Sequence, residues 1–271
     1  MIPQPVPQTA PTAISQTRNL WRIYALEAKY ELLKQLRLPA YVVPALGFPL
    51  VFYLLFGVAL NHGTAGPFDV PTYMLATYGA FGVMNTALFA FGAGVAVERG
   101  QGWMLFKRAT PMPPFAHFFG KLAMAVLFAL VMVGALFTLG ATAGGVRLSA
   151  ATWFSLCGVL VGGTLPFAAF GLAVGYWAGP NSAVAVLNIL ALPAAFGSGM
   201  WIPIQMLPPL VKRISLFLPP YHYAQLALHT LGLDRGDQSP AHHVAFLAAF
   251  TAASLLFAWI GYRRDDGKTF G

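Results

Sequence analysis

The chain has 271 residues, of which 58% are hydrophobic and only 9% carry a charge, and its formal net charge is +8. Ordinary soluble domains contain about 25% charged residues, so this composition excludes a typical soluble domain and is typical of an integral membrane protein. The positive charge comes without a nucleic-acid-binding motif. Cations at the ends of apolar runs suit anionic lipid headgroups, so we expect a lipid bilayer and no nucleic acid as partner.

The first 38 residues divide into two parts. Residues 1–17 contain four prolines, no charge and no apolar core suited to a cleaved signal peptide, which predicts a disordered tail. Residues 18–38 have apolar side chains at helical spacing on one side and cations on another, which predicts an amphipathic helix at the membrane interface. The apolar positions are Trp21, Ala25, Ala28, Leu32 and Leu36, and the cations include Arg18, Arg22 and Lys29.

Five apolar windows follow, four long enough for one membrane crossing and one long enough for two. A charged side chain at mid-bilayer costs about 2.5–3.5 kcal/mol, so uncharged windows mark the candidate spans. Residues 148–211 form the longest window, with sixty-four consecutive uncharged residues, and Gly179-Pro180-Asn181 predicts a turn inside it. The expected fold is an all-α integral membrane protein with its transmembrane domain over 39–262 and a cytoplasmic tail over 263–271. The spans are about 41–60, 73–95, 122–143, 153–177, 183–199 and 243–262.

Residues 200–220 do not suit a spanning helix. They are apolar, but they contain five prolines together with Lys212 and Arg213. Non-helical backbone at membrane depth needs cover from protein or a wet cavity. We therefore expect a re-entrant segment that enters the membrane and returns to the same side, between spans five and six.

The distribution of Lys and Arg predicts the orientation. With six crossings, the segments on the side of the two termini contain twelve of these residues and the other side contains four. Positively charged segments remain in the cytoplasm. We therefore expect a multi-pass protein of the cell (inner or plasma) membrane with both termini cytoplasmic.

The segment between spans two and three, residues 98–118, is predicted to be cytoplasmic and is both charged and aromatic. A short helix from about Gly102 to Ala109 would present Trp103, Phe106 and Lys107 on neighbouring faces. Aromatic and Arg side chains often dominate binding to a partner, so this segment suits a groove on a soluble protein. The same residues also suit an interfacial loop, and composition does not distinguish the two.

Two ordered motifs resemble the permease subunits of type-2 ABC exporters. The first, in the 98–118 segment, comprises Glu98-Arg99, Gly102, Leu105 and Thr110-Pro111. The second, between spans five and six, comprises Ser198-Gly199, Pro203, Leu207-Pro208, Ile214, Leu218-Pro219, Tyr223-Ala224 and Leu228. Together with the six-span plan, the resemblance covers roughly residues 18–265.

The resemblance implies a half-transporter in which two permeases, identical or paralogous, pair with two ABC ATPase subunits. The ATPase-coupling residues would be Glu98, Arg99, Trp103, Phe106, Lys107, Arg108 and Pro111. The segment shaping the exit would include Gly199, Pro203, Leu207, Pro208, Leu218 and Pro219. Helix contacts within or between protomers could use the small-residue pairs Gly140/Gly144, Gly158/Gly162 and Gly171/Gly175.

The sequence offers no nucleotide site of its own. A P-loop needs Gly, four residues and then Gly-Lys-Ser/Thr, but Gly267-Lys268-Thr269 is preceded at the required position by Tyr262. We therefore expect no cofactor on this chain and ATP with Mg²⁺ on the partner subunit, and we do not expect the chain to be an enzyme.

The remaining polar residues indicate no other chemistry. No histidine spacing matches a known metal site, and His242 and His243 would point about 100° apart on a helix, so we expect no metal. No acid lies in mid-span, which disfavours an ion-coupled carrier.

The predicted function is that of a permease subunit of an ATP-driven exporter for an amphiphilic, drug-like or lipid-like substrate, with the substrate-binding residues unknown. Export of a lipid-linked polysaccharide is one alternative. A second alternative, from another class, is an integral membrane enzyme using His242, His243 and Asp234 at the outer interface.

Overall fold

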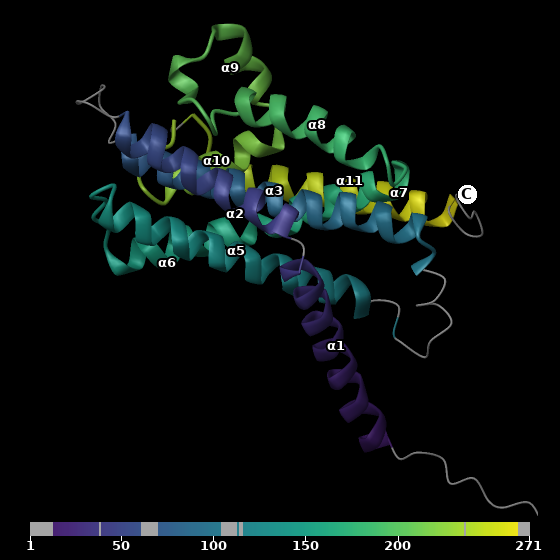
Figure 1. Cartoon of the computed structure of the whole chain (residues 1–271). Helices are drawn as coiled ribbons and strands as arrows, with labels where there is room; N and C mark the ends of the chain where they lie inside the picture. Colours follow the sequence, from purple (N-terminus) through teal and green to yellow (C-terminus); the bar gives the residue numbers. More distant parts are fainter. Residues whose placement is uncertain are drawn as a thin grey trace, which may run out of the picture.

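The computed structural model describes residues 13–37, 39–60, 70–103, 113, 116–235 and 237–264 (Figure 1). All regular structure within these residues is helical and none is a strand, which confirms the predicted all-α class. The helices in chain order are α1 (Ala13–Leu36), α2 (Pro39–Phe52), the π-helix η1 (Tyr53–Ala59), α3 (Val70–Gly100), α5 (Ala116–Thr142), α6 (Ala150–Gly162), α7 (Thr164–Trp177), α8 (Ala183–Gly197), the 3-10 turn η2 (Ile204–Met206), α9 (Pro209–Ser215), α10 (Pro219–His229) and α11 (Pro240–Arg264).

Four helical stretches in the described residues are long and apolar enough to cross a membrane: α3, α5, α6 together with α7, and α11. They correspond to the predicted spans 73–95, 122–143, 153–177 and 243–262, of which only 122–143 extends beyond its helix, by one residue. The predicted spans 41–60 and 183–199 fall on shorter apolar helices, Ala45–Ala59 and Ala183–Gly197. Helices α3 and α11 extend beyond the predicted spans. The predicted spans end before charged residues, whereas the helices continue through Arg99 in α3 and through Arg263 and Arg264 in α11.

Helix α3 forms the centre of the bundle and packs closely on α7. A Cβ atom on Gly171 would lie 2.7 Å from the Leu88 carbonyl oxygen, and one on Gly175 would lie 2.9 Å from the Gly92 carbonyl oxygen. Small residues let two helix backbones approach in this way. The Gly171/Gly175 pair is therefore used within the chain, against α3.

Residues 153–177, predicted as one span, form two helices that meet at Gly163. The ring of Tyr223 from α10 occupies the space beside this glycine, so that a Cβ atom on Gly163 would lie 2.1 Å from the ring. The Tyr223 hydroxyl donates a hydrogen bond to the Leu160 carbonyl oxygen over 2.5 Å. The break between α6 and α7 thus accommodates a buried tyrosine.

The proline-rich 41–60 stretch forms α2 and continues directly into η1. Tyr53, the first residue of η1, is fully buried. Its ring points towards α5, where a Cβ atom on Gly144 would lie 2.3 Å from the tyrosine hydroxyl and one on Gly140 would lie 3.4 Å from it. The Gly140/Gly144 pair therefore makes room for a side chain of the same chain.

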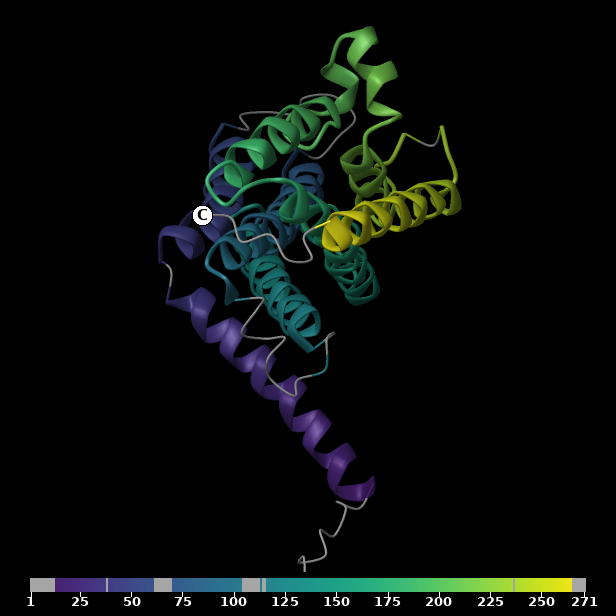
Figure 2. The same cartoon turned by 90° about the vertical axis from the view of Figure 1, so that its right-hand side faces the viewer.

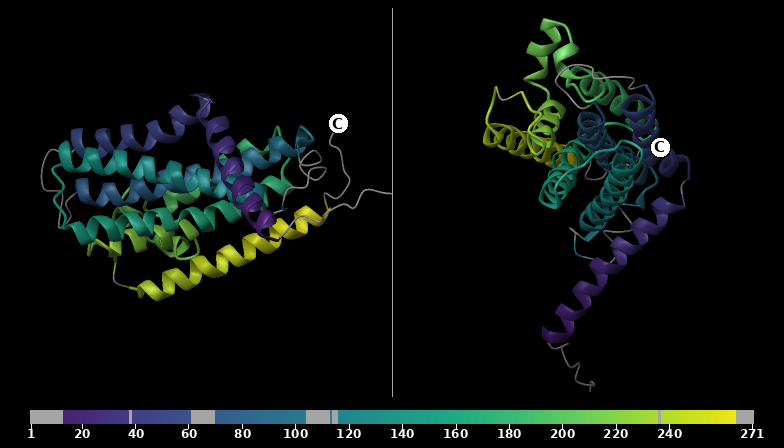
Figure 3. Two further views of the ribbon diagram at one scale, coloured as in Figure 1. Left: turned by 90° about the horizontal axis from the view of Figure 1, so that it is seen from below. Right: turned by 90° about the vertical axis from the view of Figure 1, so that its left-hand side faces the viewer.

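Helix α1 leaves the bundle at a steep angle (Figures 1 and 2). Seen from below, the long helices run in one general direction and α1 crosses them (Figure 3). It begins at Ala13, before the predicted start at residue 18, because Pro11 is the last of the N-terminal prolines and nothing after it interrupts a helix. Its apolar Trp21 and Leu36 are exposed, whereas the side facing the bundle includes the buried polar residues Glu31 and Gln35 beside the apolar Leu32.

Candidate functional site

Charged side chains converge where α1, α3 and α5 meet, at the end of the bundle nearest the C-terminus (Figure 1). Glu98, near the end of α3, lies 2.8 Å from the ammonium group of Lys121 on α5, and that lysine is 1% exposed. Lys121 also lies 3.4 Å from a carboxylate oxygen of Glu31 on α1. Because buried charges must be paired, these contacts hold three helices in one arrangement.

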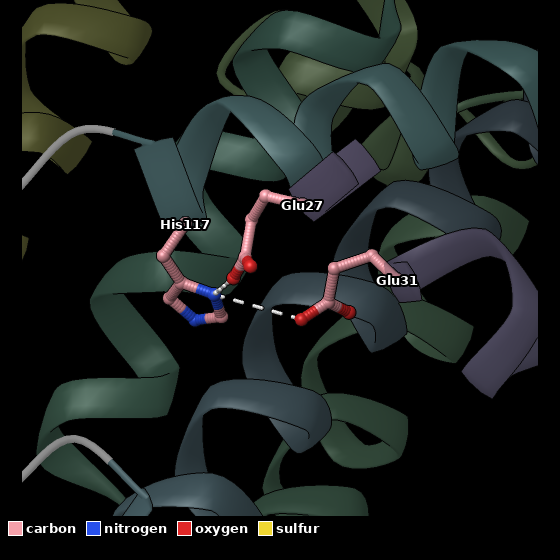
Figure 4. Close-up of side chains that lie close together, drawn as sticks. All are labelled: Glu27, Glu31 and His117. Atoms are coloured by element: carbon pink, nitrogen blue, oxygen red, sulfur yellow. Dashed lines mark hydrogen bonds and ion pairs between the residues drawn. The ribbon is translucent and has the colours of Figure 1, made fainter. Parts of the chain in front are cut away.

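His117, in the first turn of α5, joins the same network from the other side. Its Nε2 atom lies 2.9 Å from Glu98 Oε2. Its Nδ1 atom faces α1, at 3.3 Å from Glu27 Oε1 and 3.5 Å from Glu31 Oε1 (Figure 4). The imidazole is therefore placed between carboxylates of α1 and α3.

Lys34 of α1 extends the network towards solvent, with its side chain 45% exposed. Its ammonium group lies 2.9 Å from Glu31 and also pairs with Glu98. Burial acts against the charge of Lys34, but attraction to Glu98 and Glu31 outweighs this, so the pKa of Lys34 is raised above its ordinary value. We call Glu27, Glu31, Lys34, Glu98, His117 and Lys121 the inner charge cluster, where the inner end is the end of the bundle nearest the C-terminus and the outer end is the opposite one.

A glycine on α5 permits this arrangement. A Cβ atom on Gly120 would lie 2.9 Å from the side chain of Glu27 and 3.1 Å from its backbone carbonyl carbon. Helix α5 can therefore approach the α1 backbone closely at this position. Gly120 sits between His117 and Lys121, so the close approach brings both side chains against α1.

A cavity of about 670 Å³ adjoins the inner charge cluster between α1 and α3. One part of its wall is charged, with Glu31, Lys34 and Glu98 among the lining residues. The rest is mainly apolar, and includes Phe89, Val97 and Trp103. The cavity wall is therefore charged on one side and apolar on the other.

Two of the predicted coupling residues lie next to this cluster. The Arg99 guanidinium donates a hydrogen bond to the Gly175 carbonyl oxygen of α7 and lies 5.4 Å from the centre of the Tyr176 ring. Trp103 follows the end of α3 and is 55% exposed. The other predicted coupling residues lie outside the described residues: Phe106, Lys107, Arg108 and Pro111.

Of the described histidine, cysteine and acidic side chains, Glu27, Glu31 and His117 have ligand atoms within 4.8 Å of one another and could in principle hold a metal ion. Both Lys34 and Lys121 already approach Glu31. Ammonium groups beside a carboxylate oppose a second cation, so the geometry favours an ion-pair network.

Sequence reasoning identified Glu98 but not its partners in the inner charge cluster. A signal was present on α1, where Glu27, Glu31 and Lys34 follow helical spacing and share one face. A polar face of this kind on an interfacial helix is normally expected to face solvent. Only the tertiary structure shows that this face packs against α5.

The predicted exit segment forms turns and short helices at the opposite end of the bundle. Gly199 has a φ of +82°, and its carbonyl oxygen accepts a hydrogen bond of 3.2 Å from the Tyr73 hydroxyl. Pro203 precedes η2 and Leu207 follows it, Pro208 precedes α9, and Leu218 and Pro219 mark the start of α10. The structure thus brings this segment back against α3.

Two residues of the alternative enzyme site, His243 and Asp234, have different partners at this end. His243 Nδ1 lies 2.8 Å from His222 Nδ1 of α10. Asp234 pairs instead with His229, at 3.2 Å.

Comparison with known proteins assigns the chain to a class. Residues 24–231 match the family described as "ABC-2 type transporter". The chain belongs to this family of transport permeases, and its apolar helices are those of a multi-pass membrane protein. It is also 26% identical over 236 residues to "Putative transport permease YvfS" of Bacillus subtilis (strain 168), covering 87% of this chain and 95% of that protein.

Proposed function

We propose that the chain is the permease subunit of an ATP-driven exporter and that two permeases assemble with two ABC ATPase subunits. Family membership and the absence of a P-loop from the sequence support an external source of energy. ATP and Mg²⁺ would then be bound by the partner, and this chain would convert the partner's motion into a change of access.

The proposed topology has six crossings, with both termini and the 98–118 segment in the cytoplasm. The four long spans are joined by two shorter ones, the α2–η1 helix and α8, and residues 200–220 form the re-entrant segment. The asymmetry of Lys and Arg supports this orientation. The inner charge cluster then lies at the cytoplasmic face and Gly199 lies towards the outside.

The observation that carries the coupling role is the burial of Glu98 in the inner charge cluster. Glu98 lies five residues before Trp103, and His117 lies where the chain re-enters the bundle after the 98–118 segment. A force on this segment therefore acts directly on side chains that join α1, α3 and α5. We expect the segment to dock on the ATPase through Trp103 and Phe106.

The proposed substrate is an amphiphile from the inner leaflet or the cytoplasm. The cavity between α1 and α3 supports this class, because it offers charged groups beside an apolar wall. Neighbouring genes for glycosyltransferases would instead favour a lipid-linked polysaccharide.

Purification with an ABC ATPase encoded by a neighbouring gene tests the proposal. We expect a stable complex that hydrolyses ATP and moves substrate in proteoliposomes. Replacing Trp103 and Phe106 by Ala should reduce transport per ATP hydrolysed at least tenfold. A matched control is Phe154→Ala, which removes an aromatic side chain that is 79% exposed on α6. Failure of the ATPase to associate, or full coupling in the double variant, would contradict the proposal.

A further inference from the structure

Three histidines from two helices gather at the end of the bundle opposite the C-terminus. His222 belongs to α10, whereas His242 and His243 lie in the first turn of α11. The ring centre of His222 lies 5.0 Å from that of His243 and 5.7 Å from that of His242, and the latter two lie 6.1 Å apart. The sequence places only His242 and His243 next to each other, on one helix. It could not show that α10 brings a third imidazole to them.

The contacts of His222 determine where its proton lies. Its Nε2 atom is 3.0 Å from the Leu216 carbonyl oxygen, which can only accept a hydrogen bond, so Nε2 carries a proton. In the neutral ring, Nδ1 then carries no proton, and its lone pair faces His243 Nδ1 at a distance of 2.8 Å. The ring is also stacked on Phe246, with centroids 3.8 Å apart, so this lone pair has a fixed direction.

This arrangement is the one that metal-binding histidines commonly adopt. A backbone carbonyl that accepts a hydrogen bond from one ring nitrogen orients the other nitrogen towards the ion. Here both rings of the close pair are buried, at 0% exposure for His222 and 3% for His243. His242 is exposed, so it can turn and leaves a path by which an ion could enter.

The distances within the close pair agree with such an ion after a small adjustment, and the exposed His242 would have to turn towards it. Zinc–nitrogen bonds are about 2.0–2.1 Å, so two tetrahedral ligand nitrogens lie about 3.4 Å apart and their ring centres about 5 Å apart. The His222 and His243 nitrogens would have to separate by about 0.6 Å. The proton between these two nitrogens would move from Nδ1 to Nε2 of His243, so that both Nδ1 atoms can coordinate while each imidazole stays neutral.

We propose that His222, His242 and His243 form a binding site for a transition-metal ion of the zinc type. Imidazole nitrogen is a preferred ligand of such ions. Asp234, close enough to act electrostatically on His243, supplies negative charge beside the site, and the neighbouring Arg235 is already paired with Asp237 at 2.8 Å. The ion would link α10 to α11 and so fix the helix that follows the 198–218 segment.

Zinc titration of the purified full chain, with affinity-tag histidines removed, tests the site. We expect one Zn²⁺ per chain, and a Co²⁺-substituted sample should show the visible absorption bands of tetrahedral nitrogen ligation. His243→Ala and His222→Ala should each abolish binding, and His242→Ala should weaken it at least about tenfold. His62→Ala is the matched control and should bind as the wild type does.

Thermal unfolding of each variant without metal shows whether the variant is folded, so that loss of zinc binding can be distinguished from loss of the fold. Zinc should raise the unfolding midpoint of the wild type and of His62→Ala, raise that of His242→Ala less, and leave those of His222→Ala and His243→Ala unchanged. Should His222→Ala fail to fold, the exposed position of His242 still provides a folded variant. A folded wild-type chain that binds no Zn²⁺ would overturn the proposal, as would wild-type affinity in His242→Ala or His243→Ala.

Discussion

The two ends of the bundle are held together by different forces. At the inner end, α1, α3 and α5 are joined by ion pairs among buried or half-buried charges, with Lys121 1% exposed at the centre. At the outer end, helices are joined by single hydrogen bonds of aromatic and imidazole side chains, such as Tyr73 with Gly199 and His222 with Leu216.

This difference indicates which end can respond to a partner. A charge network depends on each member, because removing one leaves another charge buried without its pair. Outer contacts depend on shape and on single hydrogen bonds, whose net worth is about 0.5–1.5 kcal/mol each. The inner end is therefore the region in which an applied force or a changed charge has the largest consequence.

The largest effect should come from Glu98→Gln. This change keeps the side-chain shape but removes the negative charge beside Lys121 and His117. We expect the free energy of unfolding to fall by about 3 kcal/mol, the lower end of the cost of breaking a buried pair, since Glu31 remains 3.4 Å from Lys121. This loss can be measured by unfolding the protein in mixed micelles that contain increasing amounts of SDS.

Asp237→Asn is the matched change at the outer end. It breaks an ion pair with Arg235, but the Asp237 side chain is 54% exposed, so the expected loss is about 0–1 kcal/mol. Equal losses for the two variants would remove the distinction between the ends.

Helix packing gives the next largest effect. Gly171→Ala places a methyl group 2.7 Å from the Leu88 carbonyl oxygen, and backbone cannot easily yield, so stability should fall by about 1–3 kcal/mol. Gly158→Ala meets no atom within 4 Å and should be neutral or stabilising, by up to about 1 kcal/mol, because alanine favours a helix. Thermal unfolding of both variants in detergent provides the comparison.

Much of the fold could be predicted from the sequence, because lipid restricts where charge can lie. The uncharged windows located the four described helical stretches that are long and apolar enough to cross a membrane, and the proline content of 200–220 correctly indicated that no long helix forms there. The break at Gly163 could not be predicted, since it depends on Tyr223, which is sixty residues away in the chain. A periodic apolar run does not reveal a side chain inserted from another helix.

The candidate site was less predictable than the fold. Glu98 and Arg99 were identified through a family resemblance, which says nothing of what they contact. Their partners come from α1, α5 and α7, and pairing over such sequence distances depends on helix rotation and on the close approach at Gly120. The contact between His222 and His243 could not be predicted either, because it forms only when α10 packs against α11.

A smaller effect is expected from Tyr223→Phe. The change removes the hydroxyl that bonds the Leu160 carbonyl oxygen but keeps the ring beside Gly163. The expected loss is about 1 kcal/mol, and it can be measured by the same unfolding assay. No loss would mean that the ring alone holds α10 against α6.

The smallest effect on stability is expected from Trp103→Ala. The side chain is 55% exposed, so the change should alter the free energy of unfolding by less than about 0.5 kcal/mol. A large loss of stability would show that Trp103 is part of the packed bundle rather than a surface for a partner.

The orientation of the two ends can be tested most directly by cysteine labelling in intact cells. In a Cys157→Ser background, Trp103→Cys places a thiol at the inner end and Ala143→Cys places one at the exposed connection after α5. We expect a membrane-impermeant maleimide to label only Ala143→Cys, and to label both after the cells are opened. Labelling of Trp103→Cys from outside intact cells would contradict the proposed account.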